Sequence, residues 1–108
     1  MNIDLPRTIA AFFQAFNAHD IDAFTVLFAR GAFVADEGRE YPGTAAIKAW
    51  IEKANASYKP HAVPTDLAHS DGKIVVTAEV SGTFPGSPAP LHYRFTLKDD
   101  KIAALSCD

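Results

Sequence analysis

Hydrophobic residues near the start of the chain recur every three or four positions, which is typical of one face of an amphipathic α-helix. The set is Leu5, Ile9, Phe12, Phe13 and Phe16. We expect Asp4 to cap this helix and Pro6 to lie in its first turn, where a missing N–H does no harm. After a break at residues 17–20, Asp20 predicts the N-cap of a second short helix that ends at residues 30–31.

Short strands and a third helix follow. The pattern predicts a strand over residues 32–36, a turn over 36–39 and a second strand over 39–41. After the break at Pro42, Thr44 is positioned to cap a third helix. The helical period places four residues on its inward face: Ile47, Trp50, Ile51 and Ala54.

The second half of the chain is rich in strand signals. They predict strands over residues 61–68, 73–84, 91–97 and 101–107. Pro64 restricts the first of these to a sheet edge or a bulge, and Asp71-Gly72 predicts a tight turn after it. In the third, Leu91, Tyr93 and Phe95 face one side and alternate with polar residues.

This order of elements predicts an α+β fold in a single domain spanning residues 1–108. Short turns imply antiparallel neighbours, so we expect three N-terminal helices packed on a curved, mostly antiparallel sheet. A sheet that curls around helices leaves a concave pocket on the helix side.

Composition and charge narrow the partners. The chain has 108 residues, 48% of them hydrophobic, with a formal net charge of −3 and no basic run. Nucleic acid and anionic membranes are therefore not expected as partners. Cys107 is the single cysteine, no apolar run is long enough to cross a bilayer, and residues 1–7 lack the features of a signal peptide. These observations predict a cytoplasmic protein.

Common cofactor and metal motifs are missing from the sequence. There is no phosphate loop, dinucleotide fingerprint or nucleophile elbow, so we expect no cofactor. The spacing of His19, His61, His69 and His92 does not favour convergence on a metal, although His61 or His69 could serve as an acid–base group. Cys107 has no basic neighbour in sequence, which gives a nucleophilic role little support.

Four stretches carry a family resemblance: residues 16–29, 32–36, 42–47 and 91–95. Together they resemble the nuclear transport factor 2-like superfamily, on its SnoaL-like and ketosteroid-isomerase-like branch. The resemblance implies a cone-shaped α+β fold, a ligand cavity inside the cone and frequent homodimers formed through the sheet. It implies no single function, because this fold hosts isomerases, cyclases, hydrolases and binding modules.

The resemblance also implies roles for particular residues. The family's general base, an aspartate at the end of the first strand, falls on Asp36. Ala32, Val34 and Asp36 share one strand parity, which favours an inward Asp36, although a solvated turn aspartate is the alternative. The family's oxyanion tyrosine and protonated aspartate fall on Phe12 and Leu91, neither of which can donate a hydrogen bond from its side chain. Efficient ketosteroid isomerisation is therefore not expected.

Two functional hypotheses follow. The first is a cofactor-free isomerase or cyclase-like enzyme in which Asp36 removes a proton beside a carbonyl of a hydrophobic small molecule. The second is a non-catalytic ligand-binding or dimerisation domain of the same fold. Tyr93 could offer a hydroxyl in the pocket or be an ordinary core tyrosine. The predicted pocket lining is Phe12, Phe16, Phe33, Trp50, Tyr58, Leu91 and Tyr93. We also expect a homodimer through a mixed outward face: Val75, Thr77, Arg94 and Thr96.

Overall fold

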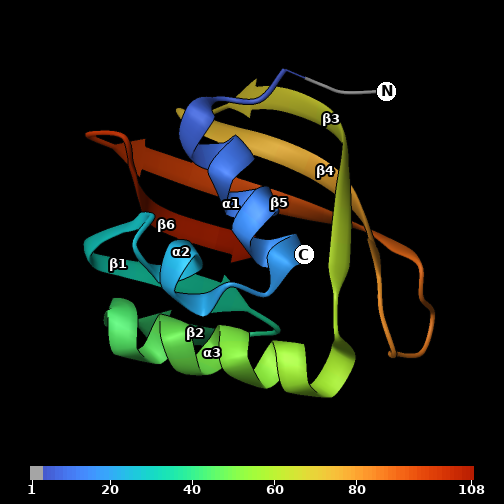
Figure 1. Ribbon diagram of the computed structural model, residues 1–108. Helices are drawn as coiled ribbons and strands as arrows, with labels where there is room; N and C mark the ends of the chain where they lie inside the picture. The colour runs from blue at the N-terminus through green and yellow to red at the C-terminus, as the bar shows by residue number, and fades with distance from the viewer. Residues whose placement is uncertain (1–3) are drawn as a thin grey trace.

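The structure is a computed structural model that describes residues 4–108, and within them it has three helices and a six-stranded sheet (Figure 1). The mixed α+β class is confirmed. The elements are α1 (Arg7–Ala18), α2 (Ile21–Thr25), β1 (Phe28–Asp36), β2 (Arg39–Pro42), α3 (Gly43–Tyr58), β3 (His61–Ser70), β4 (Lys73–Ser81), β5 (Ala89–Lys98) and β6 (Lys101–Cys107). Met1–Ile3, the start of the segment compared with a signal peptide, lie outside the described residues.

The strands form one sheet in the order β2-β1-β6-β5-β4-β3. Every neighbouring pair is antiparallel except β1 and β6, which run parallel. β3 is an edge strand, and its register shifts between Pro64 and Asp66, as a proline that cannot donate to the ladder requires. The tight turn after it is confirmed too, since Asp71 and Gly72 both have positive φ.

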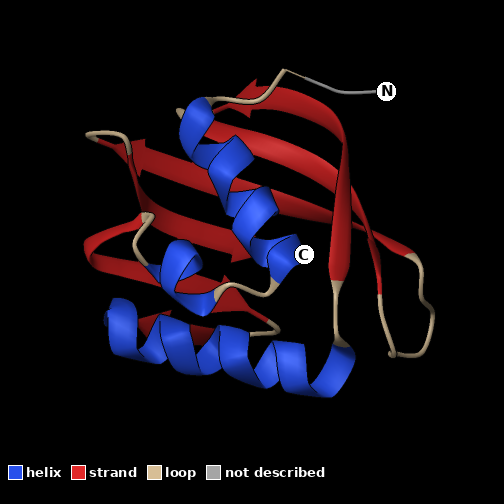
Figure 2. Ribbon diagram, viewed as in Figure 1, coloured by secondary structure: helices blue, strands red, loops and turns tan. Residues whose placement is uncertain are grey.

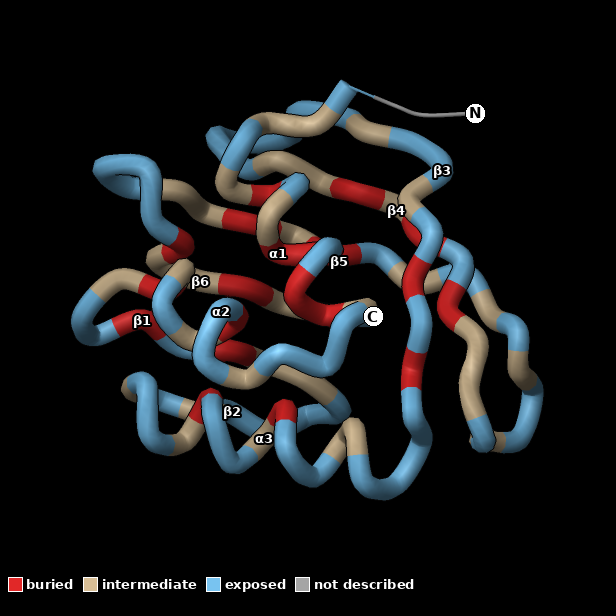
Figure 3. The backbone as a smooth tube through the Cα atoms, viewed as in Figure 1, coloured by how far each residue is buried: buried red, intermediate tan, exposed pale blue. Residues whose placement is uncertain are grey.

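The helices lie against one face of the sheet, where α1 crosses the strands and α3 runs beside β2 (Figures 1 and 2). Buried segments concentrate where α1 meets the strands (Figure 3). Phe12, at the centre of α1, has no exposed surface. Its ring lies within 6.5 Å, centroid to centroid, of six others: Phe13, Phe16, Phe24, Phe28, Tyr93 and Phe95. Burying one such ring contributes about 1.5–3 kcal/mol, so this cluster fixes α1 on the sheet.

Two predicted helix caps are wrong. Pro6 occupies the N-cap position of α1 and Pro42 that of α3, and neither helix has a side-chain cap bond. Asp4 therefore lies before the cap, and Thr44 lies within the first turn of α3. A proline at a helix start has no N–H to leave unpaired, and its ring holds φ in a range compatible with a helix beginning. The predicted cap at Asp20 is confirmed, because its Oδ1 accepts from the Ala23 N–H at 3.1 Å.

The second helix is shorter than the periodicity predicted. It ends at Thr25, and β1 already begins at Phe28, within the predicted helix. Pairing with β6 explains the difference: the Ile102 N–H donates to the Leu27 carbonyl at 2.9 Å, and Phe28 pairs with Ile102. Sheet hydrogen bonds to a distant strand therefore override a local helical spacing at this point.

Candidate functional site

Asp36, Cys107 and Tyr93 form a row across three adjacent strands. Asp36 on β1 pairs with Cys107 on β6, which in turn pairs with Tyr93 on β5. Residues directly opposite one another in a sheet point to the same face, so all three side chains share a face. Strands lie about 4.8 Å apart, which puts the Cα atoms of Asp36 and Tyr93 roughly 10 Å from each other.

This row lies in the wall of a cavity of about 530 Å³ that lies between the sheet, α1 and α3 and opens to solvent. Most of the wall is apolar or aromatic. Its lining residues are Phe16, Asp36, Glu37, Gly38, Trp50, Ile51, Ala54, Tyr58, Pro60, Val80, Phe84, Leu91, Tyr93, Cys107 and Asp108. A volume of this size holds a small organic molecule. A smaller adjoining cleft of about 340 Å³ shares Asp36 and Trp50 with it and adds the cationic side chains of Arg39 and Lys53.

Asp36 stands at the end of β1, with its carboxylate half-buried in the cavity wall. The indole N–H of Trp50, on α3, donates to Asp36 Oδ2 at 3.1 Å. Burial raises the pKa of Asp36 above its ordinary value; the Trp50 hydrogen bond lowers it, the nearby charge of Glu37 raises it, and a hydrogen bond from the Glu37 main chain lowers it. The carboxylate is thus both oriented and made more basic than a solvated aspartate.

Tyr93 is 3% exposed and lies under α1. The ring of Phe13 packs edge-on against it at 5.3 Å and that of Phe16 at 6.4 Å. Among residues 4–108 its hydroxyl takes part in no hydrogen bond. Burial raises the pKa of Tyr93 far above its ordinary value, and charge on Cys107 and Asp36 raises it further. At neutral pH the phenol is protonated and able to donate.

Cys107 is the site residue that the sequence reasoning missed. It lies between Asp36 and Tyr93 and lines the cavity. Burial raises the pKa of its thiol well above the ordinary value, and the charges of Asp36 and Asp108 add to this. The group is therefore a protonated thiol, which is a poor nucleophile. The alternation of Leu105 and Cys107 along β6 was the available signal, because it places both on the same face.

Five of the seven predicted lining residues do line the cavity: Phe16, Trp50, Tyr58, Leu91 and Tyr93. The predictions for Phe12 and Phe33 are wrong. Phe12 is fully enclosed by other aromatic rings beneath α1, and Phe33 is 39% exposed because its parity on β1 is opposite to that of Val34 and Asp36. The apolar lining residues that were not predicted as such are Ile51, Ala54, Pro60, Val80 and Phe84.

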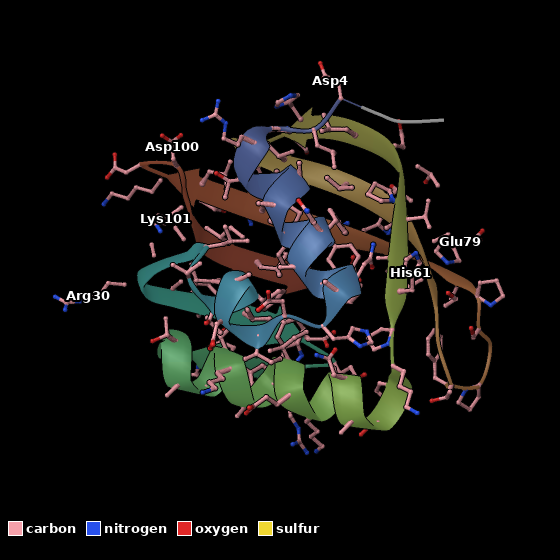
Figure 4. The ribbon with its side chains drawn as sticks, viewed as in Figure 1. Asp4, Arg30, His61, Glu79, Asp100 and Lys101 are labelled. Atoms are coloured by element: carbon pink, nitrogen blue, oxygen red, sulfur yellow. The ribbon has the colours of Figure 1, made fainter. Side chains whose placement is uncertain are left out.

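The histidines lie outside the cavity wall. His61 is exposed on β3 (Figure 4), and His69 is exposed farther along the same strand. His19 contacts the Pro60 carbonyl through Nε2 at 3.0 Å, which joins the end of α1 to the start of β3. Neither His61 nor His69 is placed to act on a molecule in the cavity. Within residues 4–108 no three His, Cys, Asp or Glu side chains are grouped so that they could hold a metal ion.

Comparison with known proteins identifies the family of this chain. The family model described as a SnoaL-like domain matches residues 9–105. The chain belongs to the SnoaL-like family. A putative polyketide cyclase from Sinorhizobium meliloti, protein SMa1630, is 40% identical to this SnoaL-like chain, with 97% of this chain and 96% of that one covered and a TM-score of 0.93.

More distant structures show that the SnoaL-like chain has the nuclear transport factor 2-like fold. A protein of ketosteroid isomerase-like fold from Catenulispora acidiphila, solved with trimethylamine, is 19% identical, with coverage of 97% and 86% and a TM-score of 0.84. A putative polyketide cyclase from Xanthomonas campestris pv. campestris is 22% identical, with coverage of 93% and 85% and a TM-score of 0.78.

No protein with a curated description matches the SnoaL-like chain. No helix among residues 4–108 is both long enough and apolar enough to span a membrane.

Proposed function

We propose that this SnoaL-like protein is a cofactor-free enzyme of isomerase or cyclase type, acting on a hydrophobic carbonyl compound with Asp36 as the general base. The observation that carries the proposal is the position of the Asp36 carboxylate in the wall of an apolar cavity, with Oδ2 held by the Trp50 indole. A base that is partly desolvated and fixed in orientation is suited to remove a proton from carbon.

The proposed step balances without a cofactor. The C–H bond beside the carbonyl breaks, its proton goes to the Asp36 carboxylate, and its electron pair forms a C=C bond while the carbonyl π pair moves to oxygen. When the substrate is a β,γ-unsaturated ketone, the enolate is conjugated as a dienolate; its oxygen pair re-forms the C=O bond, the π electrons shift so that the double bond lies next to the carbonyl, and the γ-carbon takes the proton back from Asp36, which yields an isomer. Alternatively, the enolate carbon attacks a second carbonyl of the same molecule, and the proton passes from Asp36 to the new alkoxide, which yields a ring.

The relatives support this class of reaction. The protein from Sinorhizobium meliloti, which is 40% identical over almost the whole chain, is described as a putative polyketide cyclase. Cyclisation of this kind and isomerisation both begin with the removal of a proton beside a carbonyl. The choice between them depends on the substrate that the cavity holds.

Hydrogen–deuterium exchange tests the proposal without knowledge of the natural substrate. The probe is 2-decalone, a neutral bicyclic ketone, incubated with protein in D₂O and followed by NMR. Native protein should accelerate exchange beside the carbonyl, and Asp36→Asn should remove about 10²–10⁴-fold of that acceleration. Asp66→Asn, on the exposed surface of β3, is the matched control and should exchange as native protein does.

A second candidate function is a non-catalytic binding domain. One observation favours it. The family's two oxyanion donors fall on Phe12 and Leu91, whose side chains cannot donate a hydrogen bond, and Phe12 is enclosed in the core. Under this alternative, 2-decalone binds in the cavity, but its exchange in native protein is no faster than in Asp36→Asn. That result would replace the enzymatic proposal.

We further propose that the helices and the curved sheet form a cone around the ligand and that the protein is a homodimer. The outward side chains of Val75, Thr77, Arg94 and Thr96 remain partly exposed on the open face of β4 and β5, where a second sheet could pack. Sedimentation at micromolar concentration should give the mass of a dimer, and a monomer at every concentration would defeat this expectation.

A further inference from the structure

We infer that the Tyr93 hydroxyl is the hydrogen-bond donor that holds the carbonyl oxygen of a ligand in the Asp36 cavity. This inference rests on the proposed function and deepens it. By the family resemblance, the donors to the carbonyl oxygen would be a tyrosine at position 12 on α1 and an aspartate at position 91 on β5. The inference assigns this role to Tyr93, two residues farther along β5.

The Tyr93 hydroxyl lies on a buried side chain, is uncommitted, and lines the same cavity as the proposed base. The side chain is 3% exposed and lines the cavity, and among residues 4–108 its hydroxyl has no hydrogen-bond partner. The hydroxyl oxygen is not fully buried, so it faces open space at the cavity wall. Its row across the sheet places it one strand beyond Cys107 from Asp36.

An unpaired buried hydroxyl favours a ligand that can accept its hydrogen bond. A phenol that faces the cavity and has no protein partner can donate its hydrogen bond to the carbonyl oxygen of a ligand, and the apolar surroundings strengthen that bond. The side chain has little freedom to turn elsewhere, because the rings of Phe13, Phe16 and Phe95 pack around it. The donor is thus fixed before a ligand arrives.

The other lining groups are less suited to this role. The Trp50 N–H is already engaged by Asp36 Oδ2, and a thiol such as that of Cys107 is a weak donor. Tyr58 is 39% exposed, so water competes with a ligand for the hydrogen bond of its hydroxyl. The carboxylates of Glu37 and Asp108 only accept when ionised. Tyr93 is therefore the strong donor of the described cavity wall that is not committed and that belongs to a buried side chain.

The Tyr93 hydroxyl supplies the donor that the proton transfer proposed for Asp36 requires at the carbonyl oxygen. When Asp36 takes the proton from carbon, negative charge develops on the carbonyl oxygen, where the Tyr93 O–H donates. Because burial and the neighbouring acidic groups raise the pKa of Tyr93, the phenol keeps its proton and the interaction stays a hydrogen bond. A single preorganised donor of this kind is worth about 10²–10³-fold in rate. The ligand class that fits is a neutral carbonyl compound whose oxygen lies under α1 and whose acidic carbon faces β1.

The test compares Tyr93→Phe with Ser70→Ala. Both variants lose one hydroxyl, but Ser70 is exposed at the end of β3, outside the walls of the cavity and of the adjoining cleft. The hydroxyl of Tyr93 has no protein partner, so its removal should leave the fold and the melting temperature intact. The probe is 2-decalone labelled with ¹³C at the carbonyl, bound to each protein and observed by NMR and infrared spectroscopy.

In native protein and Ser70→Ala, the bound carbonyl should show a downfield ¹³C shift and a lowered stretching frequency. Tyr93→Phe should lose both changes, and exchange in D₂O should fall by about 10²-fold. An unchanged carbonyl signal in Tyr93→Phe would overturn the inference, and if Asp36→Asn still abolished exchange, the proposed function would stand. If instead the signal depended on Tyr93 while exchange did not depend on Asp36, the donor would be supported and the proposed function would fail.

Discussion

The indole N–H of Trp50 donates to Oδ2 of Asp36 at 3.1 Å, joining the middle of α3 to the end of β1. The Trp50 ring is itself held between aromatic neighbours, with ring centroids 6.1 Å from Tyr41 and 6.2 Å from Phe24. A helix that packs on the sheet thus also sets the orientation of the proposed base. This link connects the fold to the chemistry of the cavity.

Replacing Trp50 by Phe should raise the pKa of Asp36. The indole hydrogen bond favours the charged carboxylate and lowers the pKa of Asp36. Without it, less opposes the increase in pKa that burial causes. Losing a hydrogen bond to a charged group should also reduce the free energy of unfolding by about 1.5–3 kcal/mol. The pKa is measured from the carboxyl ¹³C signal across a pH titration.

Glu37→Gln provides the opposite control. The charge of Glu37 raises the pKa of Asp36, so its removal should lower that pKa while Trp50 stays in place. If both variants moved the Asp36 pKa in the same direction, the proposed causes of its shift would be wrong.

The reactivity of Cys107 should depend on Asp36. The thiol has a raised pKa partly because of the carboxylate charge, so Asp36→Asn should increase the thiolate fraction at pH 8. Alkylation by iodoacetamide, followed by mass spectrometry, should then be several-fold faster than in native protein. The chain has one cysteine, so the reading is unambiguous.

Two comparisons accompany this measurement. Asp66→Asn, on exposed β3, should label at the native rate, and saturating 2-decalone should slow labelling in native protein by filling the cavity. Equal rates in Asp36→Asn and native protein would show that the carboxylate does not influence the thiol.

A tyrosine at position 12 should destabilise the protein. The ring of Phe12 is fully enclosed, so the added hydroxyl of Phe12→Tyr would be buried without a partner and would cost about 1–3 kcal/mol. The variant should gain no deuterium-exchange activity, because this position does not reach the cavity. Phe33→Tyr makes the same chemical change on the exposed face and should stay within about 0.5 kcal/mol of native protein. Urea unfolding compares the two, and equal stability would contradict the enclosed position of Phe12.

Local patterns in the sequence predict much of this fold. Alternation along residues 91–97 assigned the inward face of β5, and the parity of Val34 and Asp36 assigned that of β1. Caps were harder to predict, because a proline and a capping side chain compete for the same position at a helix start. The helix predicted after Asp20 ran too far because pairing between Phe28 and Ile102 depends on a strand at the other end of the chain.

The candidate site was predictable only in part for the same reason. Asp36 and Tyr93 could each be placed on an inward face, but nothing local shows that Cys107 lies between them. Helical periodicity also cannot separate Phe12, which packs in the core, from Phe16, which reaches the cavity one turn later. The position of Cys107 depends on how β1 and β6 align in parallel, and the difference between Phe12 and Phe16 depends on where α1 lies over the sheet.

The measurement that tests the central claim most directly is the pH dependence of 2-decalone exchange, set beside the NMR titration of the Asp36 carboxyl. A protonated Asp36 cannot accept a proton, so the exchange rate should fall as pH falls through the Asp36 pKa. Because burial raises that pKa, the loss should occur at a higher pH than for a solvated aspartate. We predict that the two midpoints coincide above the ordinary aspartate value. An Asp36 that titrates at its ordinary value, or an exchange rate that does not follow its titration, would contradict the assignment of Asp36 as the base.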